Sequence, residues 1–388
     1  MKLREIYIKG FKSIDGERGQ TIPFGDVTVL LGANSSGKSN LLSFVEMLRC
    51  LAKQELAGFI RKQGASRLLF YGPKRTEAIT FKAFFDGGAD NRYEVELKRG
   101  LPDGLFISYE KIDFGQFDPL TKENFQVAYD QEENEDQVRS EFYCLPKSQG
   151  GESGLALDRR QTSKVIYEFL SDIRIYQFND TSETAKMKDR GYVDDAKYLR
   201  HDAGNLAAFL KMLKQNPYYE KYYSRIVRHI QRVMPQFGDF DLEPIPGAGE
   251  YVRLNWKDTS GSDYLFDPHQ ISDGSLRFMA LATLLLQPPD LLPKFIVLDE
   301  PELGLHPAAI AELSGMVRVA AQNSQVLLAT QSTRLVDEFL PEEIVVVERD
   351  EQKRSSVFKT LDAGALEDWL ARYSLSELWE KNVFGGQP

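Results

Sequence analysis

Hydrophobic and polar positions divide the chain into stretches with different predicted structure. A strand is expected over 3–8, where three apolar residues precede Gly10, and another over 27–31, which is continuously apolar as in a strand buried on both faces. The second strand runs through a glycine into a predicted helix at 40–51, where apolar residues recur at three- and four-residue spacing. This succession of strand, glycine turn and helix opens an α/β unit.

The pattern changes after residue 78. Three short alternating stretches, at 79–85, 93–98 and 105–110, are separated by the turn sequences DGGADN and RGLPDG, which predicts antiparallel hairpins. The residues that follow, up to 160, show little pattern and include the acidic stretch DQEENED at 130–136. We interpret this stretch as a mobile loop or a solvated face rather than a binding site for basic partners.

Residues 161–236 are predicted to be largely helical. In one of these helices Ile226, Ile230 and Val233 share an apolar face, and basic residues share another. The basic face is either a phosphate-binding stripe or the solvated side of an ordinary amphipathic helix, and we favour the second. It consists of Lys221, Arg225, Arg228 and Arg232.

A second α/β stretch is predicted after Pro244. It carries four further strands, with helices between the last three of them. No heptad pattern persists for three repeats, which excludes a long coiled-coil arm. The strands are expected near 251–256, 295–298, 326–329 and 344–347.

Composition narrows the class of protein but not its chemistry. A net charge of −10 over 388 residues argues against a strongly basic surface that binds nucleic acid, although it is compatible with a local basic groove. Two cysteines and four scattered histidines leave no metal-ligand spacing, and the thiols fit a reducing cytosol. The longest apolar run, 278–286, is shorter than the roughly 20 residues of a membrane span, and the start lacks a signal-peptide core. We therefore expect a cytoplasmic protein.

The loop after the second predicted strand carries the first chemical motif. Gly32, Gly37, Lys38 and Ser39 stand in the spacing G-x-x-x-x-G-K-[ST], between a buried strand and an amphipathic helix. Glycines let backbone amides surround phosphate oxygens, and the start of the helix adds positive partial charge. Lys38 is expected to reach the β and γ phosphates, and the Ser39 hydroxyl to ligate Mg²⁺. The motif predicts a site for a nucleoside triphosphate.

A second motif follows the apolar strand KFIVL at 294–298, which ends in the adjacent carboxylates Asp299 and Glu300. In a phosphate-loop NTPase, Asp299 would hold the Mg²⁺ shell at the carboxyl edge of the sheet. Glu300 would point at the γ-phosphate and orient or deprotonate the attacking water. On its own this ending is common among surface turns, but together with the glycine-rich loop it predicts the second half of one site.

Two shorter stretches narrow the class of NTPase. ISDGS at 271–275 precedes a long apolar helix; Ser272 fits a plain N-cap there. The stretch also resembles the signature motif of ABC-type ATPases, in which a Ser and a Gly at a helix start contact the γ-phosphate held by the other subunit. The strand in SQVLLATQST ends in Gln331, where that class has a switch residue that is commonly histidine. Glutamine can still hydrogen-bond phosphate but cannot titrate, which leaves the rate of hydrolysis open.

Four motifs follow one another along the chain: IKGFKSI at 8–14, GANSSGKS at 32–39, ISDGS at 271–275 and LDEPELGLHP at 298–307. In this order they resemble the SMC/RecF/OLD-like branch of ABC ATPases, and more closely the stand-alone bacterial predicted ATPases of the AAA15 kind. The resemblance covers roughly residues 1–50 and 265–350, while the middle of the chain is assigned only from its position between these two segments. The ending LDAGALEDWLARYSLSELWEKNVFGG also looks like the tail of those ATPases.

The resemblance implies a homodimer of heads that encloses two ATP, each site being completed by Ser272 and Gly274 of the other copy. It also implies that Gln177, after the strand IRIYQF, is a Mg²⁺-binding Q-loop glutamine, whereas a glutamine that ends a strand is usually only polar. His306 either lies close to the dimer interface or is a turn residue without a functional role. Further residues implied to line the nucleotide pocket are Lys12, Ser13, Asn34, Ser35, Ser36, Gly37 and Asn40.

Other architectures among the relatives fit less well. OLD-type nucleases append a metal-binding domain after the last ATPase strand, but only 40 residues follow Glu348, so we interpret Glu348 and Asp350 as a strand-end turn. A transporter subunit is disfavoured by the IKGFKSI start and by the long separation of Lys38 from Asp299, which implies a large inserted lobe.

The expected fold is α/β: a P-loop NTPase of the ABC ATPase head type, with an antiparallel β-lobe and an inserted helical lobe. The head is expected to be split in the sequence. Its N-terminal half spans 1–75, the β-rich lobe with the acidic loop 76–160, the mainly helical insertion 161–245, and the C-terminal half of the head 246–388.

Three functional hypotheses follow by analogy with the family. The first is a Mg²⁺-dependent ATPase, with Glu300, Lys38 and Gln331 as catalytic residues, that drives or regulates a partner effector such as a nuclease in DNA repair or phage defence. The second, motivated by Gln331, is an ATP-binding switch or sensor with little turnover. The third is a repair ATPase that binds DNA directly through the basic face at 221–232.

Overall fold

The computed structural model describes most of the chain as two compact units, each assembled from separate stretches of the sequence. The acidic stretch at 130–136 lies outside the described residues. The described residues are 1–86, 91–114, 141–145, 152–244, 247, 249–261 and 263–386. The first unit comprises Met1–Gly25, Ser43–Asp172 and Arg349–Phe358, and the second comprises Asp26–Leu42, Ile173–Glu348 and Lys359–Pro388.

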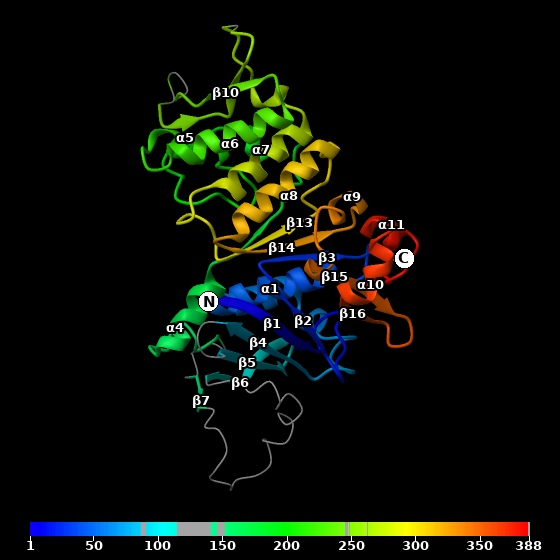
Figure 1. The fold of residues 1–388 in the computed structure, drawn as a ribbon. Coiled ribbons are helices and arrows are strands. Elements are labelled where there is room, and N and C mark those ends of the chain that lie inside the picture. The colour runs from blue at the N-terminus through cyan, green and yellow to red at the C-terminus, as the bar shows by residue number, and fades with distance from the viewer. Residues whose placement is uncertain are drawn as a thin grey trace. The chain divides into compact units, whose positions relative to one another are not determined.

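An antiparallel sheet organises the first unit. Its strands are β1 (Lys2–Lys9), β2 (Gln20–Pro23), β4 (Ala78–Asp86), β5 (Asn91–Gly100), β6 (Gly104–Phe114) and β7 (Glu141–Cys144). They pair in the order β2-β1-β4-β5-β6-β7, and β4, β5 and β6 are the three stretches expected to form hairpins (Figure 1). Alternate residues such as Phe81, Tyr93 and Val95 are buried, which gives the sheet one apolar face.

Helices and aromatic side chains complete the first unit. The helices are α2 (Leu56–Gln63), α3 (Ala65–Leu68), α4 (Gln161–Ser171) and most of α1 (Lys38–Ala52). Phe44 of α1 lies edge-on between Phe11 and Phe81, with ring centroids 5.3 Å apart in both pairs. At the start of α2 the carboxylate of Glu152 accepts two backbone N–H groups, at 2.9 and 2.8 Å, as expected of an anion at a helix N-terminus.

A largely parallel sheet forms the centre of the second unit. Its strands are β3 (Val27–Leu31), β8 (Ile173–Tyr176), β13 (Phe295–Asp299), β14 (Gln325–Thr330) and β15 (Ile344–Asp350), in the order β15-β3-β14-β13-β8. Most of a further strand, β16 (Ser355–Thr360), belongs to the first unit. All pairs from β15 to β8 are parallel. In this register Leu31 lies opposite Thr330, and Asp299 opposite Ala329. The residues that follow β3, β8, β13 and β14 therefore meet at one edge of the sheet.

The helices of the second unit include a group that lies side by side in Figure 1, α5 to α8. Residues Leu276 to Leu286 of α7 are all buried, so this helix lies inside the group. It has only 14 residues, and none of the described helices is both long and apolar enough to span a bilayer. The helices are α5 (Leu206–Gln215), α6 (Glu220–Val233), α7 (Asp273–Leu286), α8 (Pro307–Ala321), α9 (Thr333–Val336), α10 (Ala363–Leu370) and α11 (Leu375–Glu380).

The segment between β8 and α5 is less helical than expected. Apart from one 3₁₀ turn, η4 (Lys186–Lys188), and a short strand, β9 (Gly191–Tyr192), it is irregular. Asn205 is buried and donates to the carbonyl oxygens of Asp195 and Tyr198, both at 2.8 Å. Such local side-chain bonds compete with a helix for the same backbone groups.

Smaller elements complete the second unit. Two strand pairs form, between β9 and β11 and between β10 and β12. At the end of β15, in residues that belong to the first unit, Asp350 accepts the N–H groups of Gln352 and Lys353 at 2.9 Å, as in the expected strand-end turn, whereas Glu348 lies within the strand. The remaining elements are β10 (Phe237–Asp241), β11 (Tyr251–Val252), β12 (Asn255–Asp258), η5 (Pro268–Gln270) and η6 (Pro341–Glu343).

The basic face of α6 is partly neutralised. Ile226 and Ile230 of α6 are buried, as the apolar pattern predicts. Arg232 donates to Glu312 on α8 at 2.8 Å, and His229 lies 2.5 Å from the same carboxylate. The acidic partner reduces the charge that this face presents.

Candidate functional site

The loop between β3 and α1 requires glycine at two positions. A Cβ on Gly32 would lie 2.3 Å from the carbonyl oxygen of Val347 on β15, so only glycine fits against that strand. Gly37 has φ +122°, which side chains rarely adopt. These two glycines let the loop join a buried strand directly to α1, whose first residue is Lys38.

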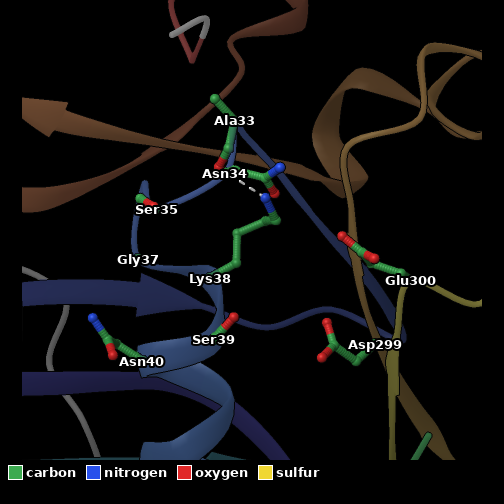
Figure 2. Close-up of a pocket in the computed structure, with 9 residues that line it drawn as sticks. All are labelled: Ala33, Asn34, Ser35, Gly37, Lys38, Ser39, Asn40, Asp299 and Glu300. Carbon is green, nitrogen blue, oxygen red and sulfur yellow. Dashed lines mark hydrogen bonds between the residues drawn. The ribbon is translucent and has the colours of Figure 1, made fainter. Parts of the chain in front are cut away.

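A cavity of about 330 Å³ is lined both by this loop and by the end of β13. In Figure 2, Lys38 and Ser39 lie on one side of it, and the carboxylates of Asp299 and Glu300 on the other. Two motifs that are far apart in the sequence therefore share one cavity. The lining residues are Ala33, Asn34, Ser35, Gly37, Lys38, Ser39, Asn40, Asp299 and Glu300, while Ser36 is buried within the loop.

The ammonium group of Lys38 is held against the loop. It donates to the carbonyl oxygens of Gly32 at 2.5 Å and Ala33 at 3.0 Å, and the residue is 6% exposed. Burial lowers the pKa of Lys38, and the nearby carboxylates, Glu300 first and then Asp299, oppose this shift. An anion in the cavity would compete with the two carbonyl oxygens for the ammonium group.

Asp299 ends β13 and is bonded to the strand beside it. Gln177 directly follows β8, which pairs with β13, and its amide donates to the Asp299 carboxylate at 2.9 Å. Burial raises the pKa of Asp299, while the bond from Gln177 and the charge of Lys38 counteract the rise. The structure thus brings Gln177 to the acidic pair, which is Asp299 and Glu300, although Gln177 does not line the cavity.

Glu300 has a backbone conformation that is unusual for a residue with a side chain. Its φ is +47°, which costs about 1–3 kcal/mol, and its N–H donates to the carbonyl oxygen of Ala329 at 2.8 Å. Gln331, just after β14, donates its amide to the Glu300 carboxylate at 3.0 Å. The strained turn therefore aims Glu300 at the cavity and beside the glutamine expected to act as the switch residue.

Two buried polar side chains near the acidic pair were not anticipated from the sequence. Glu302, three residues after Asp299, is 8% exposed, and one of its carboxylate oxygens accepts the hydroxyl of Thr330. Burial raises the pKa of Glu302, and the charges of Glu300 and Asp299 raise it further. In the sequence, Glu302 could have been noticed as the third acid of LDEPE. Acidic residues in turns are usually exposed, however, so its burial could not be predicted from this pattern.

Arg277 is the second such residue. It is 5% exposed within α7 and donates to the backbone carbonyl oxygens of Phe178 at 2.9 Å, Asn179 at 3.2 Å and Leu303. It thus connects α7 with the segments that follow Gln177 and Glu302. The signal in the sequence was a lone charge inside the apolar run of α7, because a buried charge needs such partners.

The stretch resembling a signature motif lies at the start of α7. Ser272 is the N-cap of this helix and accepts the N–H of Ser275 at 3.2 Å. A Cβ on Gly274 would lie 2.4 Å from the carbonyl oxygen of Gly304, so α7 packs closely on the turn after Glu302. Neither residue lines the cavity of its own chain. His306 caps α8, accepting the N–H of Ala308 at 3.3 Å.

Lys12 and Ser13 belong to the first unit and do not line the cavity. Lys12 donates to the hydroxyl of Ser43 at 2.6 Å, and burial lowers its pKa. The hydroxyls of Ser13 and Ser356 are hydrogen-bonded at 2.7 Å. Their predicted part in the nucleotide pocket stays a prediction.

Comparisons with known proteins give a family and a fold. Residues 27–337 match the family described as "AAA domain, putative AbiEii toxin, Type IV TA system". No curated protein matches the chain in sequence. A crystal structure of an Smc head bound to the C-winged helix domain of ScpA has a TM-score of 0.53 at 16% identity, over 94% of this chain and 99% of that one. An Smc head with an extended coiled coil, bound to the C-terminal domain of ScpA from Pyrococcus furiosus, has a TM-score of 0.50 at 16% identity, over 95% and 98%.

At this identity the Smc structures show the fold alone. Together with the family match, they confirm the predicted fold, an α/β head of the P-loop NTPase type, and at the level of the fold the resemblance to SMC/RecF-like ATPases. The structure itself contains the antiparallel sheet and the group of helices that were expected as a β-lobe and a helical lobe. The closer resemblance to AAA15-type ATPases stays a prediction. Because the family match extends over most of the sequence, the chain belongs to the family described as "AAA domain, putative AbiEii toxin, Type IV TA system".

Proposed function

We propose that the protein is an ATPase that binds MgATP in the cavity between the glycine-rich loop and the acidic pair and hydrolyses it there. The observation that carries the proposal is this shared cavity: Lys38 and Ser39 face Asp299 and Glu300 across it. Gln177 and Gln331 are hydrogen-bonded to the two carboxylates. Cation, hydroxyl, carboxylates and amides are the groups that phosphoryl transfer uses.

The donor set fits a Mg²⁺–triphosphate. The backbone amides at the start of α1 and the Lys38 ammonium would bind phosphate oxygens. Ser39, Asp299 and Gln177 would ligate Mg²⁺, which neutralises phosphate charge when bound. The described residues hold no cluster of three or more His, Cys, Asp or Glu that could bind a metal by themselves. Mg²⁺ is commonly bound through one or two carboxylates together with the phosphates of its substrate, so no such cluster is required.

Glu300 is the residue best suited to act on the attacking water. Its carboxylate faces the cavity and can accept the proton that the water loses. Gln331, bonded to the same carboxylate, cannot take a proton but can orient Glu300 and donate to phosphate. Lys38 then stabilises the charge on the transferred group.

The proposal extends to a homodimer with composite sites. Ser272 and Gly274 start α7, and their hydroxyl and amide would complete the ATP site of a second copy. The similar Smc structures are bound to domains of ScpA, and the family name refers to a toxin–antitoxin system, which supports an additional protein partner. We propose an effector partner, such as a nuclease, in DNA repair or phage defence.

Two variants test this function. Lys38→Ala should abolish ATP binding, whereas Glu300→Gln should bind ATP, fail to hydrolyse it and accumulate as a dimer. Light scattering with MgATP gives the mass of wild type and both variants. A monomeric Glu300→Gln protein saturated with ATP would exclude the dimer.

An ATP-binding switch with little turnover is the second candidate function. The bond from Gln331 to Glu300 favours it, because it engages the carboxylate that should activate water. Tight ATP binding with phosphate release at the background rate would select the switch over the ATPase.

A further inference from the structure

Glu302 is a buried carboxyl whose surroundings set it apart from the two acids that precede it. Glu302 is 8% exposed and does not line the cavity, whereas Asp299 and Glu300 both line it. One of its oxygens accepts the hydroxyl of Thr330, and the other, Oε2, is buried without a hydrogen-bond partner among the described residues. Burying a carboxyl with only part of its bonding capacity filled costs free energy, so the fold retains it here against a penalty.

Thr330 connects this carboxyl to the loop after β14. Its hydroxyl has one hydrogen, which it donates to Glu302, and it accepts the N–H of Ser332 at 2.9 Å. Thr330 is fully buried, and Ser332 is in turn the N-cap of α9, accepting the N–H of Leu335 at 3.3 Å. The residue between these two fixed positions is Gln331.

The direction of Gln331 matters for Glu300. Gln331 is exposed, and its side chain donates to Glu300 at 3.0 Å. Its position depends on the backbone on either side, which the chain of bonds from Glu302 through Thr330 to Ser332 fixes. Glu302 and Glu300 lie on the same turn, so one turn supplies both the carboxylate and the support for the amide that meets it.

We propose that Glu302 is a positioning residue that holds the loop after β14, through Thr330, so that the Gln331 amide stays on Glu300. This inference rests on the proposed function, in which Glu300 acts on the attacking water. Glu302 then affects hydrolysis without touching nucleotide, and its loss should lower kcat and leave ATP affinity unchanged. Burial and the charges of Glu300 and Asp299 raise the pKa of Glu302, which reduces the negative charge that this acid adds beside the pair.

Variants of both partners test the connection. Glu302→Ala and Thr330→Val should each lower kcat about tenfold or more, with the Kd for ATP within about twofold of wild type, because a misplaced catalytic group reduces rate rather than binding. The double variant should be little worse than either single one, since both remove the same bond. Thr330→Ser retains the hydroxyl and should recover most of the kcat lost in Thr330→Val.

A matched control separates positioning from simple loss of stability. Glu110 is another buried acid, also 8% exposed, that accepts bonds from Tyr93, Ser153 and the Gly154 N–H in the first unit. Glu110→Gln should lower Tm without changing kcat. A kcat that falls with Tm equally in Glu110→Gln and Glu302→Ala would overturn the positioning role.

A second readout works without nucleotide. Hydrogen exchange of the Ser332 amide in the nucleotide-free protein should quicken in Glu302→Ala and Thr330→Val and stay slow in Thr330→Ser. Unchanged exchange in the first two variants would overturn the inference. If wild type releases no phosphate but exchange responds as expected, the ATPase proposal fails and the connection from Glu302 to Ser332 stands. If wild type hydrolyses ATP and the variants keep full kcat, the inference alone fails.

Discussion

Lys38 and Asp299 each reduce the pKa shift that burial causes in the other. Burial lowers the pKa of the ammonium and raises that of the carboxyl, and each group opposes the other's shift. The two lie on different motifs, so the charge state of the cavity depends on both halves of the site. A substitution at either position therefore changes the electrostatics of the remaining residue as well as removing a contact.

Lys38→Ala should weaken ATP binding by at least about 100-fold, because it removes charge-assisted bonds to phosphate from a buried site. Titration with a fluorescent ATP analogue measures the loss. Lys353→Ala, at an exposed turn of the first unit, is the control and should bind like wild type. Equal affinity of the two variants would show that the cavity is not the phosphate site.

The buried acid of the first unit predicts a pH dependence of stability. Burial raises the pKa of Glu110 above its ordinary value of 4.5, so the folded chain holds this proton more tightly than the unfolded chain. The stabilisation is fully present below pH 4.5 and is lost as the pH rises through the folded pKa. Glu110→Gln cannot titrate and should lack this decline. Tm measured from about pH 4.5 to 7.5 should fall more in wild type than in the variant, and parallel curves would contradict it.

At the residue scale, the sequence was informative where spacing determines chemistry. Asp299 and Glu300 could be predicted because an apolar strand ended in them. Thr330 and Glu302 could not be assigned, because their interaction depends on the pairing of β13 with β14 and on burial. Lone polar residues in apolar runs, such as Arg277, were the weaker signal for such contacts.

Among the elements, the segment after α11 contacts the glycine-rich loop. The carbonyl oxygen of Gly386 accepts the N–H of Ala33, which lines the cavity, at 3.0 Å. Gly386 has φ +83°, and a Cβ there would lie 2.6 Å from Cγ1 of Val346. The loop is therefore supported by β15 through Gly32 and by this segment through Ala33.

Gly386→Ala should weaken ATP binding several-fold and lower Tm, because strain at this residue shifts the carbonyl that supports Ala33. Gly315→Ala is the matched control. Gly315 lies in α8 with no atom within 4 Å of an added Cβ, so alanine should stabilise by about 0.5–1 kcal/mol and leave binding unchanged. Wild-type affinity in Gly386→Ala would show that the loop does not need this support.

Elements with a strong hydrophobic pattern were also the most predictable. The strands β3, β13 and β14 are almost continuously buried, and their apolar runs identified them within a residue or two. The segment between β8 and α5 was not predictable, because buried Asn205 organises it through bonds to backbone groups. Periodicity carries no information about contacts of that kind.

For the whole molecule, the dimer proposal makes each ATP site composite. Ser272→Arg would block the contribution to the partner's site, and Lys38→Ala would disable the chain's own site, so both variants should be inactive alone. Mixed in equal amounts they should recover about a quarter of the wild-type rate, because half of the dimers would be mixed and each would carry one intact site. Phosphate release measured against mixing ratio tests this, and no recovery at any ratio would contradict composite sites.

The role of this site in hydrolysis is tested most directly by phosphate release in a single turnover with MgATP, for wild type, Lys38→Ala and Glu300→Gln. Wild type should release phosphate in a Mg²⁺-dependent reaction, Lys38→Ala should hold no nucleotide, and Glu300→Gln should hold ATP that stays uncleaved. Release by Glu300→Gln at the wild-type rate would contradict the assignment of the acidic pair to hydrolysis.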